Sequence, residues 1–328
     1  MPVDVASFLP IAACAAAYLA AAVAVRAAWL VRGSTAVPAA LWAVVACLAL
    51  AVEMGARATG RLTDPAAAAA ARLAVVSLSL CPAMSLLGAK RPQHGVWQLI
   101  VATLAVVLAM PAASAVLMRP GSLPDPHMIE RCFMPLLVLV GWMNFAGTRR
   151  AAAAACVAIG QLLLLRGFLP GVAMDGGSDP ALAGSLDAAA AGLVLVGMLW
   201  AVFSGLLVAA AKGSRRRGGR DGTGGPAAQA APVAAAIDPV FLALRETLGA
   251  AWTLRIAERF NMVAAGRGWP CRLGFGGLEH GRRMEQTSAS AGDDPAWQRD
   301  ALRTFRSLAR RFVSDAWLAR HGWRAAES

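Results

Sequence analysis

The sequence predicts a polytopic α-helical membrane protein, with about seven transmembrane helices and a small C-terminal α/β cytoplasmic module. Three observations predict this class. Of the 328 residues, 58% are hydrophobic and 15% are charged, whereas roughly a quarter of the residues in soluble domains are charged. The apolar residues from Phe8 to Ala211 fall into runs close to the ~20 residues that cross a bilayer core. After Ala211 the sequence becomes charged and glycine-rich, and then amphipathic.

The seven-helix transmembrane domain is predicted over residues 1–211. Its spans are expected at about 8–30, 36–55, 67–88, 96–118, 132–147, 151–169 and 188–211. Basic residues follow the first, third, fifth and seventh spans: Arg26, Arg32, Lys90, Arg91, Arg149, Arg150, Lys212, Arg215, Arg216, Arg217 and Arg220. Because short cytoplasmic loops collect Lys and Arg, we expect the amino terminus outside and the carboxyl terminus in the cytoplasm. The expected location is the bacterial inner (cytoplasmic) membrane.

The turn between the third and fourth spans lies in the stretch LCPAMSLLGAKRPQHGVWQ, residues 80–98. Pro92 interrupts the helix, and Lys90 and Arg91 mark the cytoplasmic side of the turn. A plain topological turn is the preferred interpretation. The alternative is that Lys90, Arg91 and His94 contact an anionic lipid headgroup or the carboxylates of a protein partner.

Ionisable residues within the predicted spans avoid the bilayer centre, where a charge is costly. Glu53 and Arg72 lie near the outer ends of consecutive spans, so we expect them to pair. Asn144 and Gln161 lie nearer mid-membrane. These four residues make up a possible intramembrane polar site, and the simpler interpretation of the two amides is interhelical hydrogen bonding.

The sequence gives only weak support for a metal-binding site or a catalytic site. Cys81 and Met84 offer soft ligands of the kind that suit Cu(I), but Pro82 alone explains a kink, and Met commonly fills gaps. His127 and Glu130 lie one turn apart without a third ligand in an evident motif. No phosphate loop, zinc-protease motif or nucleophile elbow occurs in the sequence. We therefore expect no catalytic residue, no metal and no cofactor.

The cytoplasmic part begins with a predicted flexible, basic Gly/Ala linker over residues 212–237. A helix–strand–helix module is predicted over residues 238–328. Asp238-Pro239 and Asp294-Pro295 each place an N-capping carboxylate before a proline at the first helical position. Between the helices, WPCRLGF at residues 269–275 alternates as a strand does, and a second short strand is expected near residues 277–279.

Apolar residues at helical spacing predict the module's core. They are Phe241, Leu244, Leu248, Trp252 and Ile256 in a first helix, and Leu302, Phe305, Leu308 and Phe312 in a last one. We expect Trp252 and Phe305 to be core positions.

The last predicted helix also carries a basic stripe at helical spacing, made of Arg299, Arg303, Arg306 and Arg310. Three interpretations stay open: a solvated face, contact with anionic inner-leaflet lipids, or nucleic-acid binding. Nucleic-acid binding is disfavoured because no recognisable module supports it. The linker residues Arg215, Arg216 and Arg217 are further candidates for lipid headgroup or partner contact.

Two stretches carry a resemblance to known sequences. LCPAMSLLGAKRPQHGVWQLIV, in the third and fourth spans, and AWTLRIAERFNMVAAGRGWPCRL, in the module, resemble parts of multi-spanning inner-membrane proteins of high-GC bacteria. That group carries no assigned activity, so the resemblance implies no mechanism. It implies that the membrane region and the module belong to one continuous protein.

The leading functional hypothesis is a non-enzymatic inner-membrane anchor or scaffold that presents a basic cytoplasmic interaction module to a protein partner. The alternative is a small-solute transporter or channel, and a membrane enzyme comes third. A transporter should show a polar cavity at the bilayer midplane, whereas an anchor should be packed shut with Ala, Leu and Val. Under each of these hypotheses, we expect the protein to contact the lipid bilayer and its anionic lipids.

Overall fold

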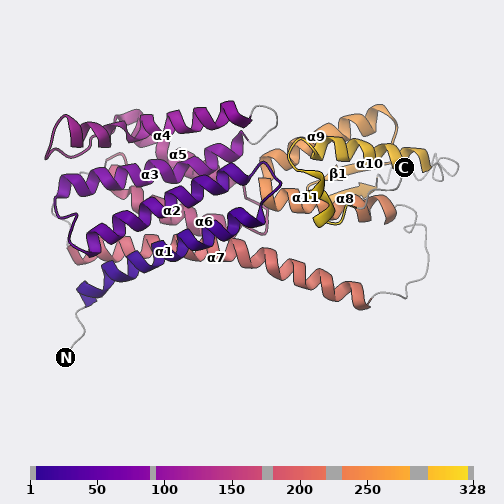
Figure 1. The fold of residues 1–328 in the computed structure, drawn as a ribbon. Helices are drawn as coiled ribbons and strands as arrows, with labels where there is room; N and C mark the ends of the chain where they lie inside the picture. Colours follow the sequence, from indigo (N-terminus) through magenta and orange to yellow (C-terminus); the bar gives the residue numbers. More distant parts are fainter. Residues whose placement is uncertain (1–4, 89–93, 172–179, 219–230, 281–294, 324–328) are drawn as a thin grey trace.

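A computed structural model describes residues 5–88, 94–171, 180–218, 231–280 and 295–323. Long helices run side by side in one bundle, and a smaller module packs against one end of it (Figure 1). We call that end of the bundle the module end and the opposite end the far end. The bundle elements are α1 (Val5–Leu30), α2 (Val37–Ala58), α3 (Pro65–Leu87), α4 (His94–Leu117), α5 (Met128–Met143), α6 (Ala151–Leu165), the 3-10 turn η1 (Arg166–Phe168) and α7 (Pro180–Gly218).

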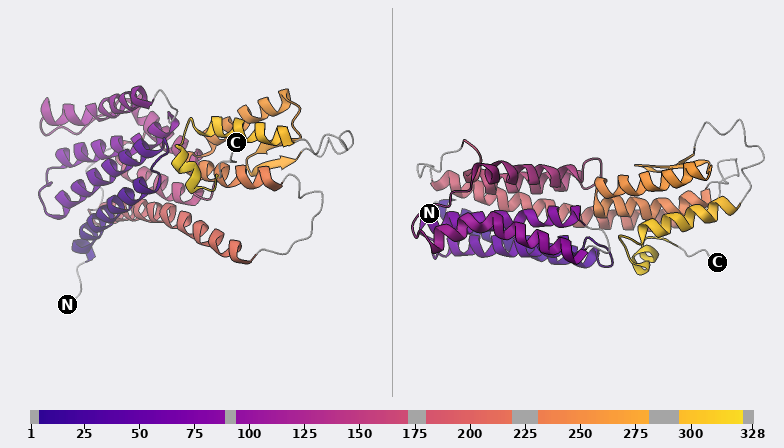
Figure 2. Two further views of the ribbon diagram at one scale, coloured as in Figure 1. Left: turned by 45° about the vertical axis from the view of Figure 1, so that its right-hand side comes forward. Right: turned by 90° about the horizontal axis from the view of Figure 1, so that it is seen from above.

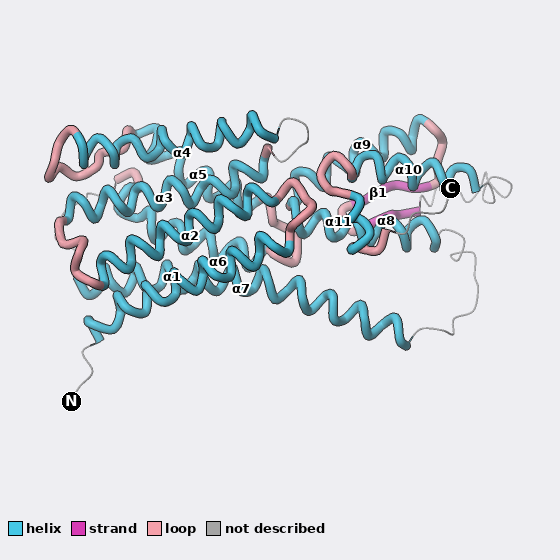
Figure 3. The backbone as a smooth tube through the Cα atoms, viewed as in Figure 1, coloured by secondary structure: helices cyan, strands magenta, loops and turns pink. Residues whose placement is uncertain are grey.

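Six helices of the described part are long and apolar enough to cross a membrane: α1, α2, α3, α4, α6 and α7. The helix in the place of the predicted fifth span, α5, has 16 residues, or roughly 24 Å at 1.5 Å per residue. That is shorter than a hydrocarbon core of about 30 Å. A helical membrane protein is thus supported, while the seventh crossing stays a prediction. The tube drawing shows α5 returning the chain from the far end to the module end (Figure 3).

The bundle packs around α3, the most buried of the six long helices. It contacts α2 and α4 along its length, and α1 lies between α2 and α7. The core is built from small and aliphatic side chains such as Ala17, Leu50, Leu73 and Leu80. Outward-facing side chains are also apolar, among them Phe8, Leu99, Val106 and Phe203, which is consistent with lipid contact.

The predicted linker is largely helical at its two ends. Residues 212–218 continue α7, which has 39 residues, and residues 231–237 belong to the next helix. The part of the predicted linker at 219–230 lies outside the described residues. Alanine has the highest helix propensity, which explains the helix at 231–237, where four of the seven residues are alanine, while residues 212–218 extend a helix that Ala209, Ala210 and Ala211 already continue.

Within its described residues, the module contains four helices and a β-hairpin, and Figure 2 shows them packed together at one end of the bundle. Its elements are α8 (Ala231–Leu248), α9 (Ala250–Gly266), β1 (Cys271–Gly274), β2 (Gly277–His280), α10 (Pro295–Ala309) and α11 (Asp315–Arg320). The strands are antiparallel, with Leu273 opposite Leu278. The second short strand expected near residues 277–279 is therefore confirmed, as is a helix that begins at Pro295.

The first predicted helix of the module is wrong at both ends. It begins at Ala231, with Pro239 inside it, so Asp238 is not its N-cap. The Asp238 carboxylate instead accepts a hydrogen bond of 2.8 Å from the Leu278 amide of the hairpin. The helix also stops at Leu248, because Gly249 has a φ of 82° and a ψ of −175°, a conformation that essentially only glycine adopts.

The core of the module contains the predicted Phe241 and Phe305, together with Phe260, which was not predicted. Phe241, Phe260 and Phe305 are fully buried and meet edge to face, with ring centroids 6.4–6.5 Å apart. Phe305 is thus a core residue, as predicted. Trp252 is only partly buried and packs at the edge of this core. The same apolar cluster includes Ala36, Ala39 and Leu86 of the bundle, so the module's core continues into the module end of the bundle.

Candidate functional site

The first contact between the module and the bundle is made by one residue, Asn144, which bonds to two helix ends. Asn144, the C-cap of α5, accepts a hydrogen bond from the Ala250 amide at its carbonyl oxygen (2.6 Å). Its Oδ1 accepts one from the Ala251 amide (3.2 Å). Its Nδ2 donates to the Leu248 carbonyl (3.1 Å). The first amides of α9 and the last carbonyl of α8 have no partner within their own helices, and Asn144 supplies both.

This contact requires a glycine at position 249, between the two helices, for two separate reasons. Its positive φ disfavours any side chain. A Cβ added there would also lie 2.3 Å from Asn144 Nδ2 and 2.4 Å from the Asn144 carbonyl oxygen. The close approach of the Asn144 backbone and side chain therefore depends on this glycine.

A second contact joins the loop between α1 and α2 to the turn between α10 and α11. The Thr35 amide donates to the Phe312 carbonyl (2.8 Å), and the Ser314 amide donates to the Gly33 carbonyl (2.7 Å). Ser34 and Val313 form an antiparallel β-bridge between these two hydrogen bonds. Two segments almost 280 residues apart in the chain thus pair as short strands do.

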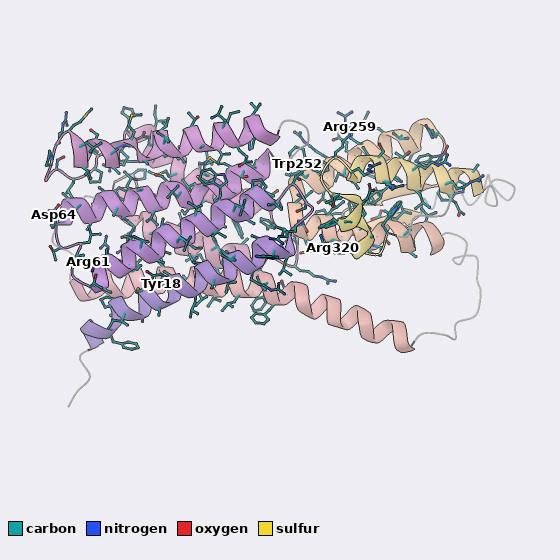
Figure 4. All side chains as sticks on the ribbon, viewed as in Figure 1. Tyr18, Arg61, Asp64, Trp252, Arg259 and Arg320 are labelled. Carbon is teal, nitrogen blue, oxygen red and sulfur yellow. The ribbon has the colours of Figure 1, made fainter. Side chains whose placement is uncertain are left out.

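A third contact comes from α3 and the loop after α5. Trp252 Nε1 donates to the Leu86 carbonyl (2.9 Å), and the Arg149 amide donates to a Glu246 carboxylate oxygen (3.1 Å). Figure 4 shows Trp252 and Arg320 at this junction, while Arg61 and Asp64 lie at the far end. Arg320 donates to the Arg32 carbonyl. Three separate parts of the module end therefore hold the module.

The turn between α3 and α4 is closed by side chains on its two flanks. Trp97 Nε1 donates to the Met84 carbonyl (2.8 Å), and Gln98 pairs with Ser85 (3.0 Å). A Cβ on Gly88 would lie 2.0 Å from the Trp97 ring. Lys90 and Arg91 lie outside the described residues, and His94 begins α4, so their predicted contacts stay predictions.

A cavity of about 300 Å³ lies inside the module-end half of the bundle. Its lining is overwhelmingly apolar and comes from α1, α2, α3, α5, α6 and α7, with a contribution from Thr247 of the module. Its polar lining residues are Ser79, Asn144, Arg150, Gln161 and Thr247. The described bundle is thus not packed shut, and this cavity is not the polar midplane cavity that the transporter hypothesis expects.

Arg150 supplies the charge in this lining. It is the N-cap residue of α6, and its amide donates to Thr148 Oγ1 (3.2 Å). Among the described residues, no acceptor lies within hydrogen-bond distance of its guanidinium group. Burial lowers the pKa of Arg150 from its ordinary value, while the charge of Glu246 acts in the opposite direction. An arginine stays protonated at neutral pH in either case.

The predicted intramembrane polar residues do not form one site. Gln161 Nε2 donates to the Ser79 carbonyl (2.7 Å), so it links α6 to α3, as expected of an interhelical amide. Asn144 faces the module at the end of α5. Both residues line the cavity, but their hydrogen bonds go to different partners.

Glu53 and Arg72 pair as predicted, at the far half of the bundle, with Arg72 Nε 2.8 Å from Glu53 Oε1. Arg72 also forms a bidentate pair with Asp187, at 2.8 and 2.9 Å. Arg57 Nε forms a salt bridge with Glu53 Oε1, and Arg166 Nη2 forms one with Asp187 Oδ1, each at 2.8 Å. This far-end ion cluster connects α2, α3, η1 and α7. Consecutive spans indicated the first pair, but nothing in the sequence indicated Asp187 as a partner.

The basic stripe on α10 is exposed at Arg299, Arg303 and Arg310 and partly buried at Arg306. Two of its members are paired, because Asp315 lies 3.1 Å from Arg306 and 3.2 Å from Arg310. Helix α10 runs roughly along the bundle direction (Figure 1), and the chain that follows it meets the bundle at the Ser34–Val313 bridge, so the stripe leads away from the bundle from Arg310 to Arg299. For Arg215, Arg216 and Arg217, only the helical backbone of α7 is described.

The candidate metal ligands have ordinary local roles. Cys81 Sγ contacts the Ser77 carbonyl (3.6 Å). His127 and Glu130 form the capping box of α5. Among the described residues, no three His, Cys, Asp or Glu side chains gather closely enough to hold a metal ion.

Comparison with protein-family models, with curated proteins and with solved structures finds no match to this chain. The site is therefore interpreted from its own chemistry.

Proposed function

We propose that this protein is a non-enzymatic membrane anchor, whose bundle holds an interaction module in one fixed orientation at the cytoplasmic surface of a bacterial inner membrane. The observation that carries the proposal is Asn144, which bonds to both helices of the α8–α9 corner. Seven crossings, with the amino terminus outside and the module in the cytoplasm, are part of this proposal and rest on the one-sided clustering of Lys and Arg.

The module's free surface supports an interaction role. A groove of about 740 Å³ runs between α9 and β1. Two of its lining residues, Leu254 and Met262, are more than half exposed although apolar. Exposed apolar side chains that gather in one place are a common mark of protein contact. Burial raises the pKa of Cys271 in this groove to about 11, so its thiol is protonated at neutral pH and supplies no nucleophile.

We place the partner's contact in this groove and treat contact with anionic lipids as secondary. The α10 stripe lies along the bundle direction, so its four arginines do not lie side by side on a bilayer surface (Figure 2). The partner expected in the groove is a cytoplasmic protein that buries Leu254 and Met262.

Site-specific photo-crosslinking in cells tests the proposal. A photoreactive residue replaces Leu254 or Met262 in the full chain, and the matched control replaces Arg259, an exposed residue of the same helix outside the groove lining. A discrete protein adduct from the two groove positions and none from Arg259 is expected. Absence of such an adduct, together with solute flux through the purified protein in liposomes, would favour the transporter alternative.

A further inference from the structure

The cavity inside the bundle is long and follows the helices. On α6 its lining runs from Arg150 to Leu164, which at 1.5 Å per residue spans roughly 21 Å. On α3 it runs from Val75 to Leu87, and on α2 from Ala36 to Leu50. The lining is therefore long enough for one extended hydrocarbon chain, and the cavity is an open channel to which Thr247 of the module contributes.

The width of this cavity comes from alanine. Five alanines of α2 share one helical face of the lining: Ala36, Ala39, Ala40, Ala43 and Ala46. Ala153, Ala154 and Ala158 line it from α6. Larger aliphatic side chains at these positions would occupy the space between the helices. An apolar space of this volume is at the lower end of the range for ligand pockets, about 300–1,000 Å³.

The charge at the module end of the cavity is positive and incompletely balanced. The side chains of Arg150 and Arg245 lie near one carboxylate there, that of Glu246. Glu246 Oε1 accepts from the Arg245 side chain at 3.1 Å, and its Oε2 accepts from the Arg149 amide. Arg150 lines the cavity, and its guanidinium group makes no hydrogen bond to another described residue. A cation with free donors is thus placed at one end of an apolar channel.

We infer that this cavity binds a single-chain anionic amphiphile, with its hydrocarbon chain along α2, α3 and α6 and its carboxylate or phosphate on Arg150. The alanine faces provide an apolar surface for the chain, and guanidinium donors match the planar oxygens of a carboxylate or the oxygens of a phosphate. A cationic amphiphile would meet like charge, and a neutral one would leave the Arg150 donors unsatisfied. The inference does not depend on the partner proposed for the α9–β1 groove.

The test is binding to the full-length, delipidated protein in detergent. Native mass spectrometry follows occupancy with palmitate, hexadecyl phosphate or hexadecanol, at equal concentrations in the same micelles. One bound molecule per chain is expected for palmitate, for hexadecyl phosphate or for both, and the difference between them identifies the headgroup. Hexadecanol should bind at least tenfold more weakly, since it lacks the charge-assisted hydrogen bonds to Arg150.

Two variants separate the headgroup contact from the chain contact. Arg150→Gln should raise the Kd for the anionic probes at least tenfold and leave hexadecanol unchanged. Arg149→Gln is the matched control, because Arg149 is adjacent, exposed and absent from the lining, and it should bind as wild type does. Ala43→Phe should abolish binding of all three probes by filling the channel, and monodisperse elution shows that each variant is folded.

Four results would overturn the inference. The first three are equal affinity for hexadecanol and for both anionic probes, equal effects of Arg150→Gln and Arg149→Gln, and binding that persists in a folded Ala43→Phe protein. Absence of saturable binding by either anionic probe would overturn it as well.

Discussion

The two ends of the bundle are held together in opposite ways. At the far end, the ion cluster buries the charges of Glu53, Arg72 and Asp187 in contacts of 2.8–2.9 Å. At the module end, the contacts are mainly neutral hydrogen bonds that backbone groups make with Asn144, Trp252 and the loop at Gly33. Charged side chains take part there only by bonding to backbone groups, through Glu246 and Arg320. Buried charges are costly to leave unpaired, whereas neutral hydrogen bonds contribute about 1 kcal/mol each. The far end should therefore be the harder of the two to open.

Removing the Arg72 side chain should cause the largest loss of folding stability. Arg72→Ala leaves Glu53 and Asp187 buried without their main partner, and breaking such a pair costs roughly 3–5 kcal/mol. Arg61→Ala, at an exposed residue of the same end, should change stability by no more than about 0.5 kcal/mol. Thermal unfolding of the two purified variants measures the difference, and equal midpoints would contradict the account of the far end.

Gly249→Ala should cause the next largest loss of stability, and this loss should occur at the module end of the bundle. The backbone conformation alone costs a non-glycine residue roughly 1–3 kcal/mol, and the new Cβ meets Asn144 at 2.3 Å. We expect the module to leave the bundle while the bundle itself stays folded. Gly266→Ala is the control, since a Cβ there meets nothing within 4 Å. Limited proteolysis would register release of the module as new cleavage near residue 249, and unchanged cleavage would count against the junction.

Asn144→Ala should loosen the same contact by about 1–2 kcal/mol, the cost of losing a helix cap. Asn144→Asp keeps an acceptor for the Ala251 amide and loses the donor to Leu248. Its effect should therefore be smaller than that of alanine. Hydrogen exchange of the amides at 250 and 251 reports on this directly, and identical protection in wild type and both variants would show that Asn144 is not the cap.

Substitutions in the arginine stripe of α10 should cause the smallest change in stability. Arg310 is three residues from Val313, which bridges to Ser34 of the bundle, whereas Arg299 lies near the other end of α10, so we expect only Arg310 of the stripe to reach anionic headgroups. Arg310→Gln should reduce the stabilisation by anionic over zwitterionic nanodiscs by about 1 kcal/mol at most, and Arg299→Gln should leave it unchanged. Equal effects at both positions would mean that the stripe is a solvated face.

The same contrast explains what could be predicted from the sequence. The apolar spans, the hairpin strands and the Glu53–Arg72 pair depend on period, length and neighbouring segments, and the sequence contains all three. The junction depends on contacts over long separations, such as Asn144 with Leu248 across 104 residues. Asn and Gly belong to no periodic pattern there. Gly249 was a visible interruption between two apolar runs, but its positive φ and its neighbour Asn144 were not visible.

Asp238-Pro239 shows how a local pattern loses to tertiary contacts. The dipeptide is typical of a helix start, yet α8 begins seven residues earlier and Asp238 bonds to the hairpin. Asp187 shows a related limit. It forms salt bridges with residues of α3 and η1. A pattern within one segment cannot predict contacts between residues of different segments.

The central claim is that the bundle and the module form one rigid unit. Spin labels at Tyr18 of the bundle and Arg259 of the module, both exposed (Figure 4), test it by pulsed electron spin resonance, after replacement of the six native cysteines. The junction predicts one narrow distance distribution, which broadens in Gly249→Ala and not in Gly266→Ala. A module on a coil formed by the 26 residues 212–237 would spread over about 25–30 Å, and a distribution that broad in the wild-type protein would contradict the claim.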